Sequence, residues 1–328
     1  MTPRLREHPD ELEALVGVTA EALGMPAAYV EKDFWVTEVL RASSVARTVT
    51  MPDGTAEPVT FIFKGGTSLS RVFGIVERFS EDIDLLAEFP PGATMGARHR
   101  VLSVVDGDVR AHLGFDAERV TMGPSTKGVK RYTTYMYEAA SASEDLKEGV
   151  LLELGSRGGA HPSSVHSFRS LVAGHAIDVL GDDDSSWEEF APFSVNVLSP
   201  VRTLFEKLAA VHDAATRQDS AALRKHGRHF YDIHCLVRDP GVIAELEALD
   251  SQARQNLVDD IEQQSNAAGF SSTPRPEDGY ASSPAFDASD LSRPDIEAGY
   301  TAAEALVYGQ RVPLDEAVAS VRLAQALI

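Results

Sequence analysis

Apolar side chains near the amino terminus recur at the spacing of a helix. Between residues 10 and 23 they mark one face at i, i+3, i+4 and i+7: Leu12, Leu15, Val16, Ala22 and Leu23. Gly24-Met25-Pro26 interrupts this pattern, because glycine and proline both disfavour a continuing helix. Residues 27–42 resume it, so we expect two helices before the first strand.

A short apolar run at residues 59–63 predicts a buried strand that follows a turn-rich loop at 51–58. The strand leads into Lys64-Gly65-Gly66-Thr67-Ser68, where only small side chains follow the lysine. Residues 67–73 predict a helix, with Thr67 or Ser68 as its N-cap. Free N–H groups and the positive dipole end at the start of such a helix favour a phosphate there.

Residues 80–88 place two carboxylates among apolar neighbours in the alternation of a half-buried strand. Residues i and i+2 of a strand share a face, so Asp82 and Asp84 should point to one side and Ile83 and Leu85 to the other. Two carboxylates held this close repel each other and lose hydration unless a cation joins them. Such oxygen ligands suit Mg²⁺, with Mn²⁺ as an alternative, and Mg²⁺ also binds substrate phosphates.

The two features in this order are stronger evidence for a functional site than either feature alone. A strand, a small-residue turn, a helix and then a strand with paired aspartates predict a site for a nucleoside triphosphate and a metal ion. The alternative is a helix N-cap followed by solvated acids at the end of a strand. A single short motif does not decide between them.

The middle of the chain predicts a further mixture of helix and strand. We expect a helix over residues 98–113 and strands over 131–138 and 149–155. Residues 168–180 predict one more strand or a loop, and the aspartate-rich residues 181–186 an exposed turn.

Glu153 stands alone as a carboxylate within the apolar residues of its strand. A buried, unpaired carboxylate is costly, so two interpretations remain. Glu153 either joins a functional site as a third metal-binding acid or forms a salt bridge within the core.

From residue 199 onward the pattern becomes helical, which predicts one domain at 1–198 and a mostly helical domain at 199–328. The expected helical stretches are 201–216, 219–238, 242–264, 298–308 and 314–328. Residues 270–294 are rich in Ser, Pro, Ala and Gly, which predicts a long loop draped over the fold or a lid.

Composition narrows the class of protein. With 328 residues, 43% hydrophobic and 24% charged, the chain is long enough for a sizeable core. No apolar run approaches the roughly 20 residues that span a bilayer, and residues 1–8 do not predict a secretory signal. The single cysteine, Cys235, excludes an internal disulfide. We therefore expect a cytoplasmic protein without membrane contact.

The net charge of −20 argues against non-specific binding of nucleic acid by the whole surface. A local basic face is still compatible with a nucleic-acid substrate. Residues 201–238 hold seven basic and four acidic side chains, an excess of three positive charges. A solvated helix face is the alternative explanation of this excess.

Several common site motifs are missing from the sequence. No Gly-x-x-x-x-Gly-Lys-[Ser/Thr] occurs, which excludes a P-loop NTPase, and no Gly-x-Gly-x-x-Gly follows a strand. His226, His229 and His234 cluster in one helical region without a metal-protease motif, so surface or hydrogen-bonded histidines are favoured over metal ligands.

In its motifs the chain resembles the AbiEii/AbiGii toxin family, nucleotidyltransferase-like toxins of bacterial toxin–antitoxin systems that include the mycobacterial MenT toxins. The first motif is Lys64-Gly65-Gly66-Thr67-Ser68-Leu69 with Arg78-Phe79-Ser80-Glu81-Asp82-Ile83-Asp84-Leu85. Three more segments match in the family's order: Glu31-Lys32-Asp33-Phe34-Trp35-Val36-Thr37, Phe205-Glu206-Lys207-Leu208 and Arg228-His229-Phe230-Tyr231-Asp232-Ile233. Together they span roughly residues 30 to 240.

The resemblance implies an α+β fold. Its first domain would be the polymerase-β-like nucleotidyltransferase domain, a mixed sheet with flanking helices, and the helical domain would follow. It also implies an enzyme that transfers a nucleoside monophosphate from an NTP and releases pyrophosphate. In MenT-like members the acceptor is the 3′ end of tRNA, and its modification blocks aminoacylation and stops growth. A cognate antitoxin protein is the implied partner.

Carried over by motif, the essential pair of the first motif is Ser80 and Asp82, with Asp84 as the second acid. Lys207 and Asp232 are the essential residues of the later motifs. Glu153 occupies the strand on which the wider fold often carries a third metal-binding carboxylate.

The remaining roles follow as hypotheses. Lys64, Gly65, Gly66, Thr67 and Ser68 would bind the nucleotide. Lys207 would offset triphosphate charge. Asp232 would orient Lys207 or act on the acceptor hydroxyl, and both roles stay open. Nucleotide transfer to a protein or small-molecule hydroxyl is one alternative, and a non-enzymatic nucleotide-binding or antitoxin-binding module is another.

Overall fold

The computed structural model describes residues 2–141, 143, 146–267, 269 and 272–328. By internal packing the chain divides into two compact units. Unit 1 comprises Met1–Thr67, Glu81–Ser156 and Ser163–Val197, and unit 2 comprises Ser68–Ser80, Arg157–Pro162 and Leu198–Ile328. The predicted division into a domain at 1–198 and a helical domain at 199–328 stays a prediction.

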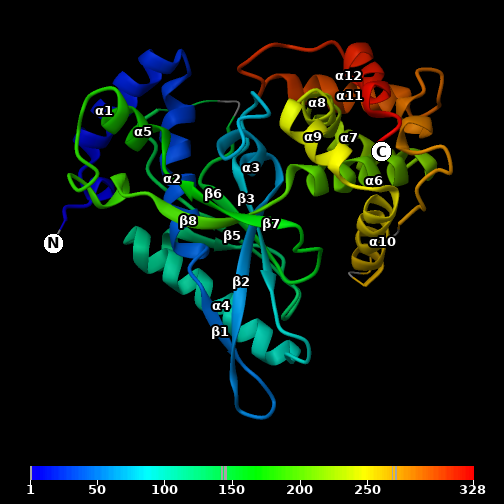
Figure 1. Ribbon diagram of the computed structural model, residues 1–328. Coiled ribbons are helices and arrows are strands. Elements are labelled where there is room, and N and C mark those ends of the chain that lie inside the picture. Colours follow the sequence, from blue (N-terminus) through cyan, green and yellow to red (C-terminus); the bar gives the residue numbers. More distant parts are fainter. Residues whose placement is uncertain (1, 142, 144–145, 268, 270–271) are drawn as a thin grey trace. The chain divides into compact units, whose positions relative to one another are not determined.

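Unit 1 contains a mixed sheet of eight strands within the described residues (Figure 1). Its strands are β1 (Arg47–Thr50), β2 (Ala56–Lys64), β3 (Asp82–Glu88), β4 (Val120–Met122), β5 (Lys130–Tyr135), β6 (Val150–Gly155), β7 (Ser163–Phe168) and β8 (Phe193–Leu198). The order is β4-β5-β6-β3-β2-β8-β7, and β1 pairs with β2 outside this path. β3 runs parallel to β6 and antiparallel to β2, which places the acid-bearing strand in the middle of the sheet.

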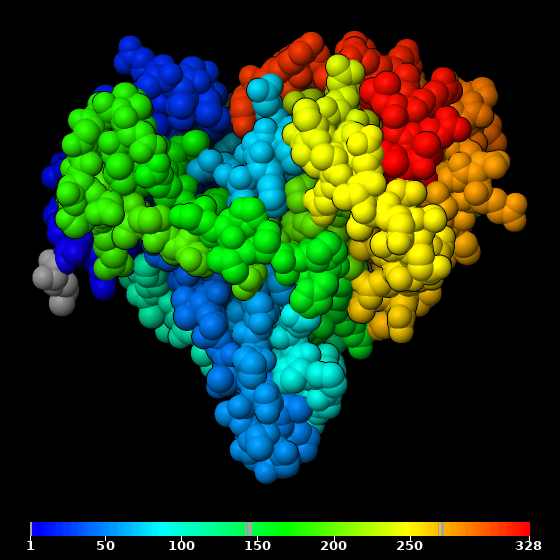
Figure 2. All heavy atoms as spheres, in the orientation of Figure 1, coloured from blue at the N-terminus to red at the C-terminus, as the bar shows by residue number. Residues whose placement is uncertain are grey.

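The sequence predicted β2, β3, β5 and β6 but not the other four strands. β4 and β7 are edge strands in which few side chains are buried. β4 has only three residues, and β7 is mostly polar, so neither shows the longer apolar alternation that marks a strand. β1 pairs with the first half of β2, where a loop was expected, and the resulting hairpin projects from the rest of unit 1 (Figures 1 and 2).

The helices of unit 1 cover the sheet. They are α1 (Pro9–Leu23), α2 (Ala27–Ser43), α4 (Met95–Leu113) and α5 (Leu171–Asp178). α2 contacts β3 and β6, α4 contacts β1 and β5, and α1 and α5 pack on α2. The two amino-terminal helices are confirmed, with Gly24 in the left-handed conformation that ends α1.

The prediction of a strand or loop at residues 168–180 was wrong, because α5 occupies most of it. Two side-chain caps explain the helix. Ser170 accepts a hydrogen bond from the N–H of Ala173, and Asp33 of α2 accepts one from the N–H of Leu171 at 2.7 Å. The second cap comes from a distant part of the chain, which no local pattern reveals.

Unit 2 is helical, as expected. Helix α3 (Gly65–Arg71) begins in unit 1 and continues into it. The others are α6 (Pro200–Thr216), α7 (Ser220–Lys225), α8 (Gly227–Leu236), α9 (Pro240–Ala248), α10 (Ser251–Ala267), α11 (Arg293–Glu304) and α12 (Leu314–Ser320). The expected helices at 219–238 and 242–264 are each divided in two. Residues 321–324 form a 3₁₀ turn where a longer last helix was predicted.

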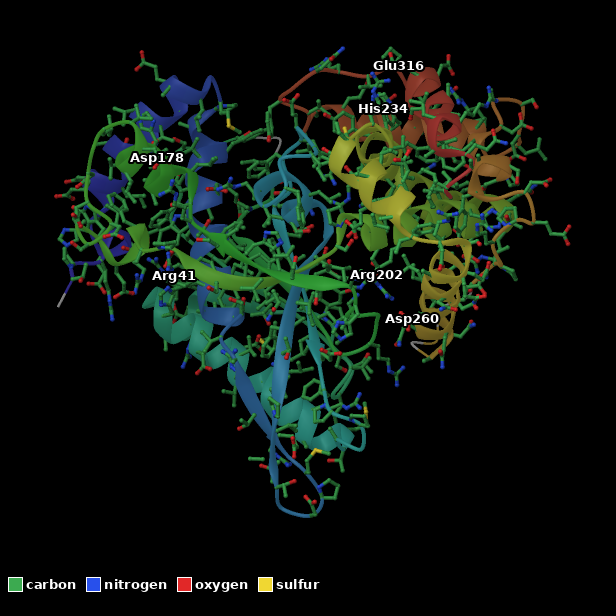
Figure 3. All side chains as sticks on the ribbon, viewed as in Figure 1. Arg41, Asp178, Arg202, His234, Asp260 and Glu316 are labelled. Carbon is green, nitrogen blue, oxygen red and sulfur yellow. The ribbon has the colours of Figure 1, made fainter. Side chains whose placement is uncertain are left out.

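The core of unit 2 is built around α6 and α8. Their buried apolar side chains include Phe205, Leu208, Phe230 and Ile233. Part of the predicted 270–294 loop joins this core, because Tyr280 and Phe286 are buried in it and pack near α6. Residues 270 and 271 lie outside the described residues. Arg202 of α6 reaches Asp260 of α10 at 2.6 Å (Figure 3).

Within the described part of the chain, no helix is both long and apolar enough to cross a membrane.

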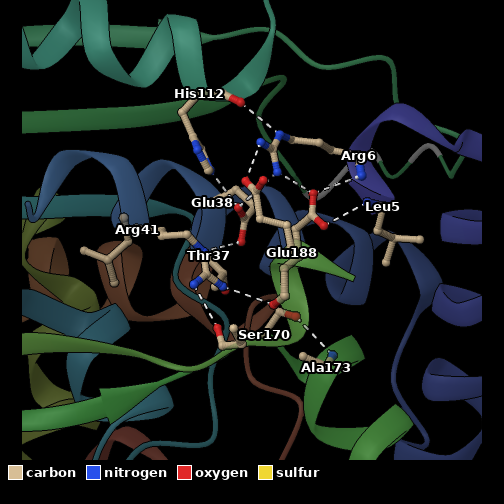
Figure 4. A network of polar contacts seen from close by, with 12 residues as sticks. Leu5, Arg6, Thr37, Glu38, Arg41, His112, Ser170, Ala173 and Glu188 are labelled. Atoms are coloured by element: carbon tan, nitrogen blue, oxygen red, sulfur yellow. Dashed lines mark hydrogen bonds and ion pairs between the residues drawn. The ribbon is translucent and has the colours of Figure 1, made fainter. Parts of the chain in front are cut away.

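A network of buried charges ties the amino terminus of unit 1 to α2 (Figure 4). Glu189 is fully buried and accepts hydrogen bonds from the N–H groups of Leu5 and Arg6 and from the Arg6 guanidinium. Arg6 also lies 3.9 Å from Glu38, which pairs with His112 at 2.8 Å. Buried charges are stable only when paired in this way.

We expect Glu189→Ala to lower the free energy of unfolding by about 3–5 kcal/mol, because it removes the fully buried partner of the Arg6 guanidinium and the acceptor of two N–H groups. Urea denaturation followed by circular dichroism measures this. Glu188→Ala is the matched control, since Glu188 is a third exposed and its loss should cost no more than about 1 kcal/mol. Equal losses for both variants would contradict the account.

Candidate active site

The two aspartates of β3 share a face of the sheet, as the alternation predicted. Asp82 and Asp84 are partly exposed, whereas Ile83 and Leu85 between and beyond them are buried. The strand therefore uses its apolar positions for the core and presents two carboxylates at its start. This local arrangement is confirmed.

Residues paired in register extend this polar face across four strands. Asp84 pairs with Lys64 of β2 on one side and with Glu153 of β6 on the other, and Glu153 pairs with Tyr132 of β5. Paired residues point to the same face, so Lys64, Asp84, Glu153 and Tyr132 form one row. The structure thus brings Glu153 beside the aspartates.

Glu153 also forms an ion pair, since its carboxylate lies 3.6 Å from the ammonium of Lys130. Lys130 stands 4.3 Å from the centre of the Tyr132 ring. Burial lowers the pKa of Lys130, but the Tyr132 hydroxyl and the Glu153 charge outweigh burial and raise it. Both interpretations of Glu153 thus stay open. Sequence reasoning missed Lys130, which lies in register with no acid of the row.

Gly65 is required to be glycine by the position of Asp84. A Cβ atom at residue 65 would lie 2.5 Å from the Asp84 carboxylate, and the residue has φ of +84°. The turn after β2 therefore passes directly over the acid-bearing strand.

The predicted N-cap at Thr67 or Ser68 was wrong, because α3 begins at Gly65 and includes both residues. Thr67 instead donates its hydroxyl hydrogen bond to the backbone carbonyl of Asp82 at 2.7 Å, which fastens the turn to the start of β3. The Ser68 side chain is buried. Nucleotide binding by residues 64–68 stays a prediction.

Ser80 does not lie on β3, where the sequence placed it. The strand begins at Asp82, and Ser80 belongs to an irregular segment of unit 2 with Arg78 and Phe79. The cause is hydrogen bonding of that segment elsewhere in unit 2, since the N–H of Phe79 donates to Leu306 and Glu77 accepts from residues 308 and 309. The essential role of Ser80 stays a prediction.

A lysine forms an ion pair with Asp82. The Lys147 ammonium lies 3.5 Å from the Asp82 carboxylate and 3.8 Å from that of Glu81. Glu81 also accepts from the Lys147 N–H, and buried Lys32 donates to the carbonyls of residues 147 and 149. Burial lowers the pKa of Lys32, and the charges of Glu81 and Asp82 oppose this.

The Lys147 contact tests whether a cation fits at Asp82. Asp82 offers a partly exposed carboxylate that already pairs with a cation, and Asp84 stands on the same face, so both oxygen donors suit a divalent ion. Among the residues that the structure describes, no group of three or more His, Cys, Asp or Glu is gathered for a metal. A ligand role for Glu153 therefore stays a prediction.

Within unit 2, Lys207 and Asp232 meet, and Arg78 joins them. Arg78 donates two parallel hydrogen bonds to the Asp232 carboxylate at 2.6 and 2.7 Å, and the Lys207 ammonium lies 2.9 Å from it. Arg78, Lys207 and Asp232 are 1%, 7% and 0% exposed. Two buried cations thus share one carboxylate.

Burial alone would raise the pKa of Asp232, but Arg78 and Lys207 outweigh burial and hold it far below its usual range. For Lys207, burial lowers the pKa, helped by Arg78, while Asp232 opposes the change. His229 is half-buried, and its pKa is also lowered, first by burial of the ring and then by the charge of Lys207. Excess positive charge characterises this cluster.

His226 and His229 stack on each other at 4.6 Å, and a metal role for them finds no support in the described residues. Arg78 was quoted in the first motif but not recognised as a site residue. Its only signal was its position just before Ser80, because its contact with Asp232 joins segments far apart in the sequence.

Comparison with known families decides the relationship. A model of the family described as "Nucleotidyl transferase AbiEii toxin, Type IV TA system" matches residues 55–318. The chain belongs to this family. AbiEii proteins are nucleotidyltransferase toxins of toxin–antitoxin systems, so membership implies a nucleotide substrate and an antitoxin partner. The match also agrees with the α+β fold. A search of curated proteins found no match.

We expect Lys147→Ala to strengthen binding of Mn²⁺ to this AbiEii protein by up to about fivefold, because it removes a cation that competes for Asp82. Paramagnetic titration measures the affinity without turnover. Lys127→Ala is the control, as Lys127 is exposed in the same unit. Unchanged or weaker binding in Lys147→Ala alone would contradict this account of Asp82.

We expect Asp232→Ala to destabilise the protein by about 3–5 kcal/mol, since it leaves two buried cations without a carboxylate. Lys207→Met should change stability by less than about 1.5 kcal/mol, because the two-bond pair between Arg78 and Asp232 remains. Denaturant unfolding of both variants distinguishes them. A large loss for Lys207→Met would show that Lys207 is mainly structural.

Proposed function

We propose that the chain is a Mg²⁺-dependent toxin that transfers a nucleoside monophosphate from an NTP to the 3′ end of tRNA. The modified tRNA cannot be aminoacylated, so translation and growth stop. The observation that carries the proposal is the pair of same-face carboxylates on β3 in a chain of the AbiEii family.

Asp82 and Asp84 are the residues that would hold the metal, Mg²⁺ or Mn²⁺, with Glu153 as a further candidate. When bound, the ion supplies charge neutralisation at the triphosphate. The row formed with Lys64 supports this assignment, because one cationic and two anionic groups there can orient a charged substrate. The turn at residues 65–68 offers backbone N–H groups to the phosphates.

In unit 2, Lys207 offsets phosphate charge while Asp232 holds its ammonium in place. The 2.9 Å contact between them supports the orienting role of Asp232 that the sequence left open. Asp232 is fully buried and accepts from both Arg78 and Lys207, which disfavours the other role as a base toward an acceptor hydroxyl. Ser80, two residues before Asp82, would contribute its hydroxyl as a contact for metal-bound water or phosphate.

The acceptor is the point on which alternatives remain. Transfer to a protein or small-molecule hydroxyl would use the same carboxylates, and the net charge of −20 favours it over RNA. A module that only binds nucleotide or antitoxin would not need a cation-attracting carboxylate pair together with a buried Lys–Asp pair.

Incubation with α-³²P-labelled NTPs, Mg²⁺, total tRNA and a protein extract tests these alternatives in one reaction. We expect the label to appear in RNA and to be released when the 3′ nucleotide is removed. In Asp82→Ala the rate of transfer should fall by at least about 100-fold. Asp184→Ala, in the exposed acidic turn, is the control and should retain full transfer. Label in protein would show that the acceptor is a protein hydroxyl and not tRNA. Label that persists in Asp82→Ala would refute the assignment of Asp82 to the active site.

A further inference from the structure

Three arginines surround a small pocket within unit 2. Its walls include Arg78, Arg228, Tyr231, Tyr300, Glu304 and Arg311 around about 270 Å³ of empty space, part of which is open to solvent. In the candidate active site, Arg78 has a role only as the partner of Asp232. The other two arginines have no part in it.

The backbone geometry that forms the pocket follows from the packing of α8 on α11. Arg228 and Tyr231 are three residues apart on α8, and Tyr300 and Glu304 are four apart on α11, so each pair shares one helix face. The helices approach closely because Gly227 meets the backbone of Gly299, where a Cβ atom would overlap.

Two further contacts fix the walls of this pocket. Tyr300 donates its hydroxyl hydrogen bond to the carbonyl of Val312 at 2.7 Å, which holds the segment after α11. Arg78 forms a bridge with Val307 and is locked by its two bonds to Asp232. The pocket therefore has one immobile guanidinium and a rigid, largely apolar wall.

The charges around this pocket do not balance. The side chains of Arg228 and Arg311 have no hydrogen-bond or ion-pair partner in the described part of the chain, and neither pairs with Glu304 across the pocket. Among the described residues, Asp232 is the one carboxylate paired with Arg78, and Arg78 shares it with Lys207. Arg78 is buried and Arg228 is half-buried, whereas Arg311 is exposed. A buried or half-buried cation favours a nearby anion, and in a chain of net charge −20 such a local excess of positive charge is unexpected.

Guanidinium groups match one class of anion best. Their planar forks bind phosphate oxygens in pairs, and an apolar surrounding strengthens the interaction by lowering the local dielectric constant. The space is narrow, so it suits a single phosphate group better than a whole nucleotide.

We propose that this arginine pocket binds a phosphate group of a substrate, with Arg228 and Arg311 as its contact residues and Arg78 as the link to Asp232. The proposal rests on the proposed function only for the source of the phosphate, which is either the NTP or the phosphodiester backbone of the RNA acceptor. A phosphate held there orients Asp232 and Lys207 through Arg78.

Binding of inorganic pyrophosphate, measured by calorimetry without divalent cations, tests the pocket independently of turnover. We expect Arg228→Ala and Arg311→Ala each to weaken binding about tenfold or more, and Arg228→Lys to lose less. Arg224→Ala is the control, because Arg224 is exposed on α7 and pairs with Asp295. Wild-type affinity in the double alanine variant would overturn the proposal. Thermal unfolding checks that the variants fold, as both arginines lack partners to lose.

Steady-state transfer kinetics then identify the source of the phosphate. If the NTP supplies it, the KM for NTP rises in Arg228→Ala and the KM for RNA does not. If the RNA supplies it, the KM for RNA rises and the slope of binding against salt concentration falls by about one. Unchanged KM values for both substrates would overturn the assignment to a substrate, whatever the outcome with pyrophosphate.

Discussion

The buried cluster of Arg78, Asp232 and Lys207 is the constraint on which unit 2 depends. One fully buried carboxylate holds two cations that come from the irregular segment before β3 and from α6, while the carboxylate itself comes from α8. Removing charges from water costs several kcal/mol for each ion, and only close, multiple hydrogen bonds offset that cost. The cluster therefore fixes three segments that are distant in sequence.

The same constraint explains chemical features around it. Burial first, and then the positive charge of Lys207, lower the pKa of His229 well below its usual value. The surplus positive charge of the cluster favours an anion as a further partner. In unit 1 the situation is reversed. There Asp82, Asp84 and Glu153 concentrate negative charge on one sheet face, and lysines 130 and 147 lie against it.

Local pattern predicted those parts of the fold that local forces determine. The alternation around Ile83 places Asp82 and Asp84 on one face because a strand has a period of two. Likewise, Gly65 was recognised as part of a tight turn, although its contact with Asp84 could not be foreseen. The family resemblance identified Lys207 and Asp232 together, and the structure brings them into contact.

Features set by distant contacts escaped prediction. Helix α5 depends on a cap from Asp33, and Ser80 leaves the strand because its segment is bound to residues 306–309. Arg78 gives no local sign of its role, since an arginine beside apolar residues is usually exposed. Edge strands β4 and β7 bury little on either face, so no hydrophobic pattern was required of them.

The central claim is that Asp232 and Lys207 act as one unit in nucleotidyl transfer. A double-mutant cycle on the transfer rate tests it, with Asp232→Asn, Lys207→Met and the double variant compared in folded protein. The account predicts that the double variant is no slower than the slower single variant, because either change already disables the pair. Losses that multiply would show that the two residues act separately and would contradict the claim.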